Sequence, residues 1–249
     1  MNLPQARPID ALRLEAAQQL LSRAGRPLPP GPRDADWLQA LIDGLCDLSS
    51  RDALTGLANR RHFELALDRE ADRAARSGEA ALLLLFDVDL FKSVNDDYGH
   101  AAGDLVLQSV ARSLQHCVRP MDTVARYGGE EFAVVLPSCQ PAFGLQVAER
   151  IRRTVELQVV NVAPDLGLSV TLSAGGAVAP PGVRSSARQW LERADAQLYR
   201  AKAGGRNRTC LEPTPHSLVS AEEKSLLFAP SATAPLDADP LAPFHRHPS

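Results

Sequence analysis

The sequence predicts a mixed α/β fold for the middle of the chain, on three observations. Helical runs alternate with short apolar runs between residues 48 and 210. The apolar run at residues 81–87 is continuous, as in a central strand that is covered on both faces. A Gly-Gly step at 128–129 joins two β-like runs, which is typical of a hairpin. One compact α/β domain is therefore expected.

The elements follow from these patterns in chain order. The first helix of the domain, residues 60–77, is rich in Ala, Glu and Arg and stops at Gly78, a common residue just past a helix end. Further helices are expected at 103–117, 142–155 and 187–203, and strands at 81–87, 123–127, 130–136, 170–178 and around Thr209. We found no internal repeat.

Proline marks both ends of this domain. Residues 26–32 read RPLPPGP, which breaks helices, and seven prolines follow Cys210. We therefore divide the chain into an N-terminal helical segment (1–47), the folded domain (48–210) and a Pro-rich tail (211–249) that is expected to be disordered.

The N-terminal segment contains two helical patterns, at residues 9–23 and 35–49. The second carries leucines at alternating steps of three and four, at positions 38, 41, 45 and 48, which is a hydrophobic seam of about two heptads. This seam is compatible with a helix that packs on its own chain and with a short dimerisation stalk.

The composition excludes several classes of protein. The 27 basic and 30 acidic side chains give a net charge of -3, without the basic excess typical of nucleic-acid binding, so no DNA partner is expected. The longest apolar run, residues 80–86, is far shorter than the roughly 20 residues of a membrane span. No secretory signal is evident at the N-terminus, and the four cysteines are widely spaced. A cytoplasmic protein with reduced thiols is expected.

Two carboxylates, Asp87 and Asp89, end the predicted central strand. Buried charge at a strand end needs compensation, and a hard cation such as Mg²⁺ supplies it, together with substrate phosphates. Val88 would offer its carbonyl, and Lys92 could meet a phosphate. The alternative is a pair of strand-end acids that face water.

A second acidic cluster follows the Gly-Gly step. Gly128 and Gly129 permit positive φ angles and close approach of a ligand to the backbone. Glu130 and Glu131 leave this turn on opposite faces, so one can bind a metal while the other faces a reacting group.

Several segments carry a resemblance to a known family. Residues 126–132, RYGGEEF, resemble the hallmark loop of the GGDEF family, the diguanylate cyclases, in its GGEEF variant. RDALTGLANRR (51–61), FDVDLFKSVNDDYGHAAGDLVL (86–107), AERIR (148–152) and LYRAKAGGRN (198–207) resemble other family segments, in the family's order. The resemblance covers about residues 48–210. It implies a βαββαβ core akin to adenylate cyclase catalytic domains and polymerase palms, with a mostly antiparallel five-stranded sheet flanked by helices and preceded by a short helical stalk.

The resemblance also implies a role for individual residues. By analogy with the family, metal would be held by Asp87, the carbonyl of Val88 and Glu131, while Glu130 would deprotonate the attacking 3′-hydroxyl. Asn95 and Asp104 would recognise the guanine edge, and His100 would lie near the base. Asn95 and Asp104 could instead be helix caps. Phosphates would be met by Lys92, Lys202 and Arg206, of which the last two could instead be solvated helix-end cations. An inhibitory product site would comprise Arg119, Asp122 and Arg150; a surface Arg–Asp pair is the alternative.

The implied activity is the condensation of two GTP molecules into cyclic di-GMP and two pyrophosphates, with two Mg²⁺ per active site, which Mn²⁺ could replace. Each domain would hold one GTP, so the expected form is a homodimer, which favours the dimerisation stalk. A separate regulatory protein could bind this stalk, and the product would promote biofilm or sessile behaviour.

Two positions depart from the family pattern without removing an acid: Glu130 stands where the family name has Asp, and Leu90 replaces an aromatic residue. Two other functions compete with catalysis: a non-catalytic receptor for cyclic di-GMP at Arg119 and Asp122, and an interaction module with a passive domain. The intact acids favour the enzyme.

Overall fold

The computed structural model describes residues 12–179, 182 and 185–213. The helices are α1 (Glu15–Arg23), α2 (Ala35–Ser50), α3 (Arg60–Ser77), α4 (Phe91–Tyr98), α5 (His100–His116), α6 (Pro141–Leu157) and α7 (Ala187–Ala203). The strands are β1 (Ala81–Val88), β2 (Thr123–Arg126), β3 (Glu131–Leu136), β4 (Val160–Ala163), β5 (Leu166–Leu168), β6 (Leu172–Ala179) and β7 (Thr209–Leu211). The tail from residue 214 lies outside the described residues, as do the first residues of the helix expected at 9–23.

Five strands form one sheet in the order β2-β3-β1-β6-β7. All neighbours are antiparallel except β6 and β7, which are parallel. The expected fold class, a mostly antiparallel five-stranded sheet flanked by helices, is therefore confirmed.

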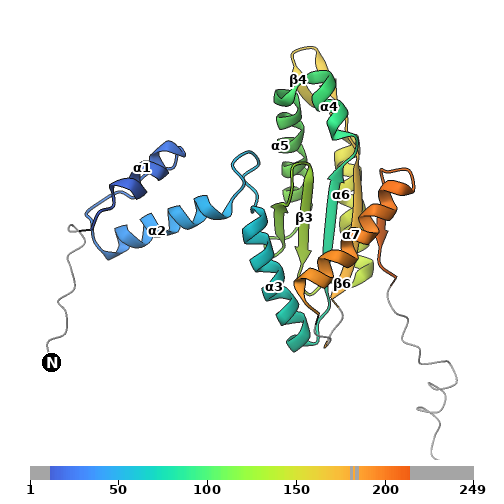
Figure 1. The fold of residues 1–249 in the computed structure, drawn as a ribbon, viewed down its shortest axis with the longest axis horizontal. Helices are drawn as coiled ribbons and strands as arrows, with labels where there is room; N and C mark the ends of the chain where they lie inside the picture. The colour runs from blue at the N-terminus through green and yellow to red at the C-terminus, as the bar shows by residue number, and fades with distance from the viewer. Residues whose placement is uncertain (1–11, 180–181, 183–184, 214–249) are drawn as a thin grey trace, which may run out of the picture. The chain divides into compact units, whose positions relative to one another are not determined.

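Helices cover both faces of the sheet, which explains why β1 is a continuous apolar run. Leu82, Leu84 and Phe86 share one core with α5 and α6. Leu83 and Leu85 belong to a second core, with α3 and α7. Figure 1 shows α3 and α7 in front of the sheet and α5 behind it. The alternation places each side chain of β1 on a definite face, including the acid at its end.

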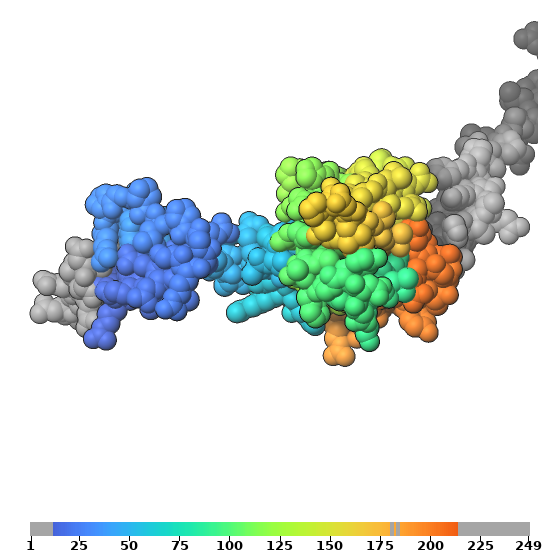
Figure 2. Space-filling view, turned by 90° about the horizontal axis from the view of Figure 1, so that it is seen from above, coloured from blue at the N-terminus to red at the C-terminus, as the bar shows by residue number. Residues whose placement is uncertain are grey.

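The chain departs from the predicted elements at two places, which lie at the same end of the domain (Figures 1 and 2). The helix expected at 103–117 starts earlier, at His100, and the preceding residues form a separate helix, α4, because Gly99 breaks the path with a φ of 80°. α4 was missed because Ser, Asn and Asp are poor helix formers. The β4–β5 hairpin was also missed, since both of its strands are very short.

The N-terminal helices form a hairpin with a small core of their own. Leu21 of α1 packs against Trp37 and Leu41 of α2, and the other seam leucines pack against this cluster, half-buried (positions 38, 45 and 48). Gly44 admits Leu21, because a Cβ there would lie 3.1 Å from Leu21 Cδ2. The seam leucines of α2 therefore pack, at least in part, against α1 of the same chain.

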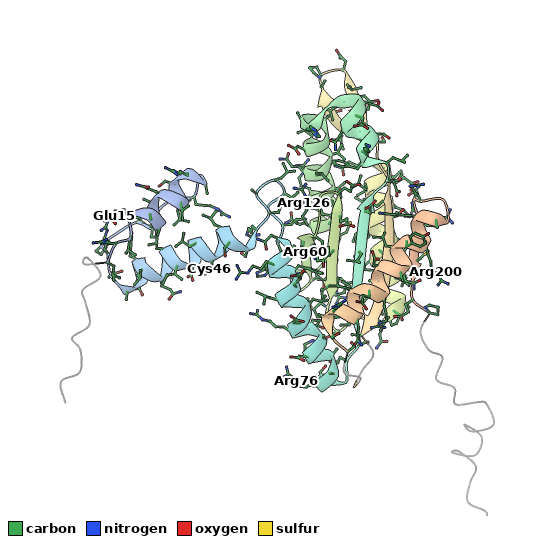
Figure 3. The ribbon with its side chains drawn as sticks, in the orientation of Figure 1. Glu15, Cys46, Arg60, Arg76, Arg126 and Arg200 are labelled. Atoms are coloured by element: carbon green, nitrogen blue, oxygen red, sulfur yellow. The ribbon has the colours of Figure 1, made fainter. Side chains whose placement is uncertain are left out.

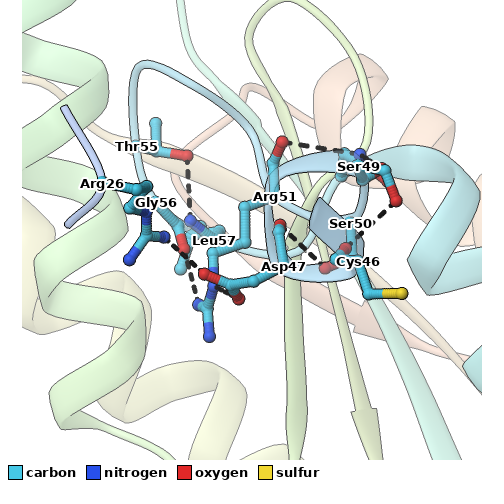
Figure 4. A network of polar contacts seen from close by, with 10 residues as sticks. Arg26, Cys46, Asp47, Ser49, Ser50, Arg51, Thr55, Gly56 and Leu57 are labelled. Carbon is cyan, nitrogen blue, oxygen red and sulfur yellow. Dashed lines mark hydrogen bonds and ion pairs between the residues drawn. The ribbon is translucent and has the colours of Figure 1, made fainter. Parts of the chain in front are cut away.

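A polar network holds the end of this hairpin (Figure 4). Asp47 pairs with Arg26, which follows α1, and with Arg51, which follows α2. Arg51 also donates to the carbonyl of Gly56 at 2.9 Å. The network therefore links α1, α2 and the loop that precedes α3. Among the helices described, none is both long and apolar enough to cross a membrane.

Candidate active site

The two predicted metal-binding carboxylates face each other across neighbouring strands. Asp87, near the end of β1, is the register partner of Glu131, the first residue of β3. Side chains that are directly opposite in an antiparallel pair have Cβ atoms about 5 Å apart. The adjacent strand positions are joined as well, since Val88 N–H donates to the carbonyl of Glu130 at 3.2 Å.

The Gly-Gly turn positions Glu131 sterically. A Cβ on Gly128 would lie 2.4 Å from Glu131 Oε2, so a larger residue there would displace this carboxylate from its present position. Gly128 and Gly129 permit positive φ angles, but neither adopts one here. The turn is closed instead by the N–H groups of Tyr127 and Gly128, which donate to the Glu131 carbonyl at 2.8 and 3.2 Å.

Arg126 supports this turn from the end of β2 (Figure 3), and sequence reasoning gave it no role. Its guanidinium donates to the carbonyl of Gly129 at 2.7 and 3.0 Å and to the carboxylate of Asp52 at 3.3 Å. Asp52 is itself held by the N–H of Thr55 at 2.9 Å. The sequence does contain a signal for the position of Asp52: its spacing from Thr55 in RDALTGL is typical of a turn capped by an Asp side chain.

The negative charges of Asp87 and Glu130 are unfavourable in the structure without a cation. Burial raises the pKa of Asp87 above its ordinary value, although its ion pair with Lys202, 2.7 Å from Nζ to Oδ2, opposes this shift. Burial, followed by the negative charge of Asp87, raises the pKa of Glu130. A cation at this place would relieve both effects.

Asp87 and Asp89 have separate surroundings, although they are only two residues apart. Asp89 is buried and accepts hydrogen bonds from Thr171 Oγ1 (2.7 Å), Ser173 Oγ (2.6 Å) and the backbone N–H of Asn207 (3.0 Å). Its charge is therefore satisfied by protein donors, and Asp87 alone of the pair is left to meet a cation.

The residues present fit a hard divalent cation. No group of three or more His, Cys, Asp or Glu side chains in the described part of the chain could hold a metal ion. Two carboxylates and a carbonyl are a smaller set, of the kind that suits Mg²⁺, which keeps waters and takes substrate phosphates as further ligands. The Lys202 ammonium on Asp87 shows that this carboxylate is placed to receive positive charge.

A second group of predicted residues lies on α4 and α5. The Asn95 side chain lies against Gly103, where a Cβ would be 2.0 Å from Asn95 Oδ1. Asp104 follows Gly103 and is exposed, as are Lys92 and His100. The structure therefore brings Asn95 to the helical turn that carries Asp104. Within the described residues, no hydrogen bond joins Lys92 or His100 to either group of predicted residues.

The predicted phosphate-binding residues Lys202 and Arg206 lie where α7 ends. Lys202 is in the last turn of this helix. Arg206 is exposed, has a φ of 60°, and donates its backbone N–H to Ala201 at 3.1 Å. Lys202 therefore stands beside Asp87 of β1, while the backbone of Arg206 is joined to the end of α7.

The third predicted set surrounds the turn before β2. Arg119 N–H donates to Asp122 Oδ2 at 2.7 Å, whereas Asp122 Oδ1 is buried without a hydrogen-bond partner among the described residues. Burial raises the pKa of Asp122. Arg150 on α6 donates to the carbonyl of Cys117 at 2.7 Å. Arg119 and Arg150 line one cavity of about 400 Å³, together with Phe143 and Gln146 among others.

Comparison with known proteins gives a family match and close structural neighbours. Residues 49–208 match the family model described as "Diguanylate cyclase, GGDEF domain". The response regulator PleD of Caulobacter vibrioides is 42% identical over 176 residues, 70% of this chain and 38% of PleD. The chain spans less than half the length of such curated relatives.

Two solved structures are similar over most of the chain. The GGDEF domain of DgcB from Caulobacter crescentus, in complex with c-di-GMP, is 38% identical with a TM-score of 0.63, covering 66% of this chain and 93% of that one. The diguanylate cyclase SiaD of Pseudomonas aeruginosa, in complex with its activator SiaC, is 36% identical with a TM-score of 0.65, covering 80% of this chain and 72% of that one.

Proposed function

Because this chain belongs to the GGDEF family of diguanylate cyclase domains, we propose that it condenses two GTP molecules into cyclic di-GMP and two pyrophosphates. The observation that carries the proposal is the pairing of Asp87 with Glu131 across β1 and β3, beside Glu130. The segment GGEEF, residues 128–132, is the proposed active-site motif. Each 3′-oxygen attacks the α-phosphorus of the other GTP, and pyrophosphate leaves.

Asp87, Glu131 and the carbonyl of Val88 are the proposed metal ligands, for two Mg²⁺ ions that Mn²⁺ could replace. When bound, such ions polarise the α-phosphate and lower the pKa of the attacking hydroxyl. Lys202 would then leave Asp87 and, with Lys92 and Arg206, hold the triphosphate. The ion pair of Lys202 with Asp87 supports this, since it holds the ammonium 2.7 Å from a proposed metal ligand.

Glu130 is the proposed proton acceptor for the 3′-hydroxyl. Burial, the larger cause of its raised pKa, is not removed when a cation neutralises Asp87, and it makes this carboxylate more basic than that of an exposed glutamate. General bases work best when their pKa approaches the working pH. Glu131 lies opposite Asp87 in the sheet. The two adjacent glutamates would therefore have different roles, Glu131 as a metal ligand and Glu130 as the proton acceptor.

Asn95 and Asp104 are proposed to recognise the guanine edge, with His100 nearby. An amide and a carboxylate match the O6, N1–H and N2–H₂ groups of guanine. The contact of the Asn95 side chain with Gly103 supports this, because Asp104 is the next residue of the same helix.

Asn95→Ala and Asp104→Ala should each weaken GTP binding by about tenfold, because one partner of a guanine hydrogen bond is lost. Metal binding should change little. Calorimetry with GTP and, separately, with Mn²⁺ measures both effects, and Asp97→Ala, an exposed change on α4, is the matched control. Use of ATP as readily as GTP by the native chain would show that guanine is not recognised.

Catalysis requires two protomers, because each domain is proposed to hold one GTP, so the chain would act as a homodimer. The N-terminal segment (1–47), the catalytic domain (48–210) and the tail (211–249) remain the proposed division of the chain. Leu41 is buried in the α1–α2 hairpin, so a dimerisation stalk would have to use exposed side chains such as Leu20 and Ile42.

The experiment that tests the function is incubation of the purified chain with GTP and Mg²⁺ over a range of protein concentrations. Cyclic di-GMP should form, and the activity per protomer should fall on dilution. Binding of cyclic di-GMP without synthesis would instead indicate a receptor, and neither synthesis nor binding would indicate an interaction module.

A separate protein is a proposed regulator of the N-terminal helices. SiaD, similar over 80% of this chain, was solved with its activator SiaC, which supports this proposal. The signalling output would be that of a second messenger, with a role in sessile growth or biofilm formation.

Arg119, Asp122 and Arg150 are proposed to bind the product as an inhibitor. The cavity that Arg119 and Arg150 share supports this, and the carboxylate of Asp122, which accepts from the Arg119 N–H, would be the acceptor for a guanine N–H. The complex of the DgcB domain with c-di-GMP is a further support.

Arg119→Ala should relieve product inhibition, raising the inhibition constant by about tenfold, because a bidentate guanidinium–guanine contact is lost. The initial rate without product should stay unchanged. Progress curves with added cyclic di-GMP measure the effect, and Arg112→Ala, an exposed arginine on α5, is the control. If the native protein kept its full rate as product accumulated, Arg119 and Asp122 would be a surface pair that does not bind the product.

A further inference from the structure

The loop after α7 has an unusual backbone. Arg206 and Asn207 have φ angles of 60° and 46°, so two consecutive residues with a Cβ adopt the left-handed region. This region is disfavoured for most such residues and is tolerated best by asparagine. The surrounding structure must therefore hold this loop in place.

Asn207 supplies three anchors. Its backbone N–H donates to Asp89 Oδ2 at 3.0 Å. Its side-chain oxygen accepts from Arg152 at 2.7 Å, and its amide nitrogen donates to Glu156 Oε1 at 2.7 Å. All of its side-chain polar atoms are thus engaged by α6, while its backbone is tied to the end of β1.

The partners of Asn207 are themselves fixed. Asp89 is 7% exposed and is also held by Thr171 and Ser173. The Arg152 side chain is 12% exposed and pairs with Glu149 and Glu156 on its own helix. Each partner of Asn207 is thus held by more than one polar contact, which makes the network rigid.

We propose that Asn207 is a positioning residue, which is locked by Asp89 and Arg152 and thereby fixes Arg206 for binding the GTP triphosphate. Arg206 is pinned on both sides, by its own N–H on Ala201 and by the Asn207 anchors. Its exposed side chain makes no hydrogen bond or ion pair with the residues that the structure describes. This inference rests on the proposed function and gives Asp89 a role apart from the metal.

Asn207→Ala and Asn207→Gly distinguish the side-chain lock from the backbone conformation. Glycine adopts a φ of 46° without strain, so it keeps the loop path but loses both amide contacts. Both variants should raise the KM for GTP by about tenfold, with kcat changed less than about twofold. A wild-type KM for Asn207→Gly would overturn the proposal.

Arg152→Met should reproduce this effect, because it removes the donor to Asn207. Arg153→Met is the matched control: Arg153 is the next residue of α6, its side chain is 72% exposed, and its nearest carboxylate is 3.9 Å away. Thermal melting of each variant shows whether it is folded. Equal effects of the two arginine changes would contradict the lock.

A double-mutant cycle with Arg206→Met tests whether Asn207 acts through Arg206. If it does, Asn207→Gly should weaken GTP binding no further in the Arg206→Met background, whereas independent effects would multiply. Calorimetry with a GTP analogue whose α,β-bridging oxygen is replaced by methylene gives the affinities. Multiplying effects would overturn this inference alone, and failure of the native chain to bind the analogue would overturn the proposed function with it.

Discussion

Asp87→Asn and Glu131→Gln should each lower the rate of cyclic di-GMP synthesis by roughly a thousandfold or more. These carboxylates face each other across β1 and β3 as the proposed metal ligands. Losing one removes charge stabilisation of several kcal/mol from the transition state, and a thousandfold corresponds to about 4 kcal/mol. Product chromatography after incubation with GTP and Mg²⁺ measures the loss.

The fold should survive these substitutions. Burial raises the pKa of Asp87, so its charge is costly in the folded protein and the isosteric Asn removes that cost, although Lys202 loses its partner. Circular dichroism should therefore be native. Glu192→Gln, an exposed change on α7, is the control for activity. Near-normal product from either variant would contradict the assignment of the metal site.

Gly175→Ala should destabilise the protein by about 3 kcal/mol or more, because the added methyl group has no room. Gly175 lies in β6, where α7 packs on the sheet. Its Cβ would lie 2.1 Å from Leu198 N and 2.5 Å from Ala194 O. Both are backbone atoms of α7, so the whole helix would have to move. Urea denaturation monitored by circular dichroism gives the free energy of unfolding.

Gly176→Ala is the matched control one residue away. Its Cβ would first meet Leu211 Cδ2 at 2.3 Å and Leu84 Cδ2 at 2.8 Å, the ends of side chains that can change rotamer. We expect a smaller loss of stability than for Gly175→Ala. Equal losses at the two positions would show that the approach of the α7 backbone is not what requires Gly175.

The sequence by itself determined the fold class and the position of most elements. Residues 60–77 and 187–203 form helices with the predicted bounds, and residues 81–87 lie in the central strand. These predictions succeeded because propensity, helix-stop residues and apolar pattern are local and agreed with one another. The family segments likewise indicated the candidate site residues, because the order of these segments along the chain is a property of the sequence.

Only the tertiary structure decided what those residues contact. Asp87 and Asp89 look equivalent in the sequence, yet Asp89 is satisfied by Thr171, by Ser173 of β6 and by Asn207, residues more than 80 positions away. Gly128 lies against the carboxylate of Glu131 and has no positive φ angle, which only the position of that side chain reveals. The seam leucines at 38–48 have α1 as a partner. The contacts of Asp89 join segments whose meeting depends on packing of the whole domain, and those of the seam leucines depend on how α1 and α2 pack. Local sequence preferences carry no information about either.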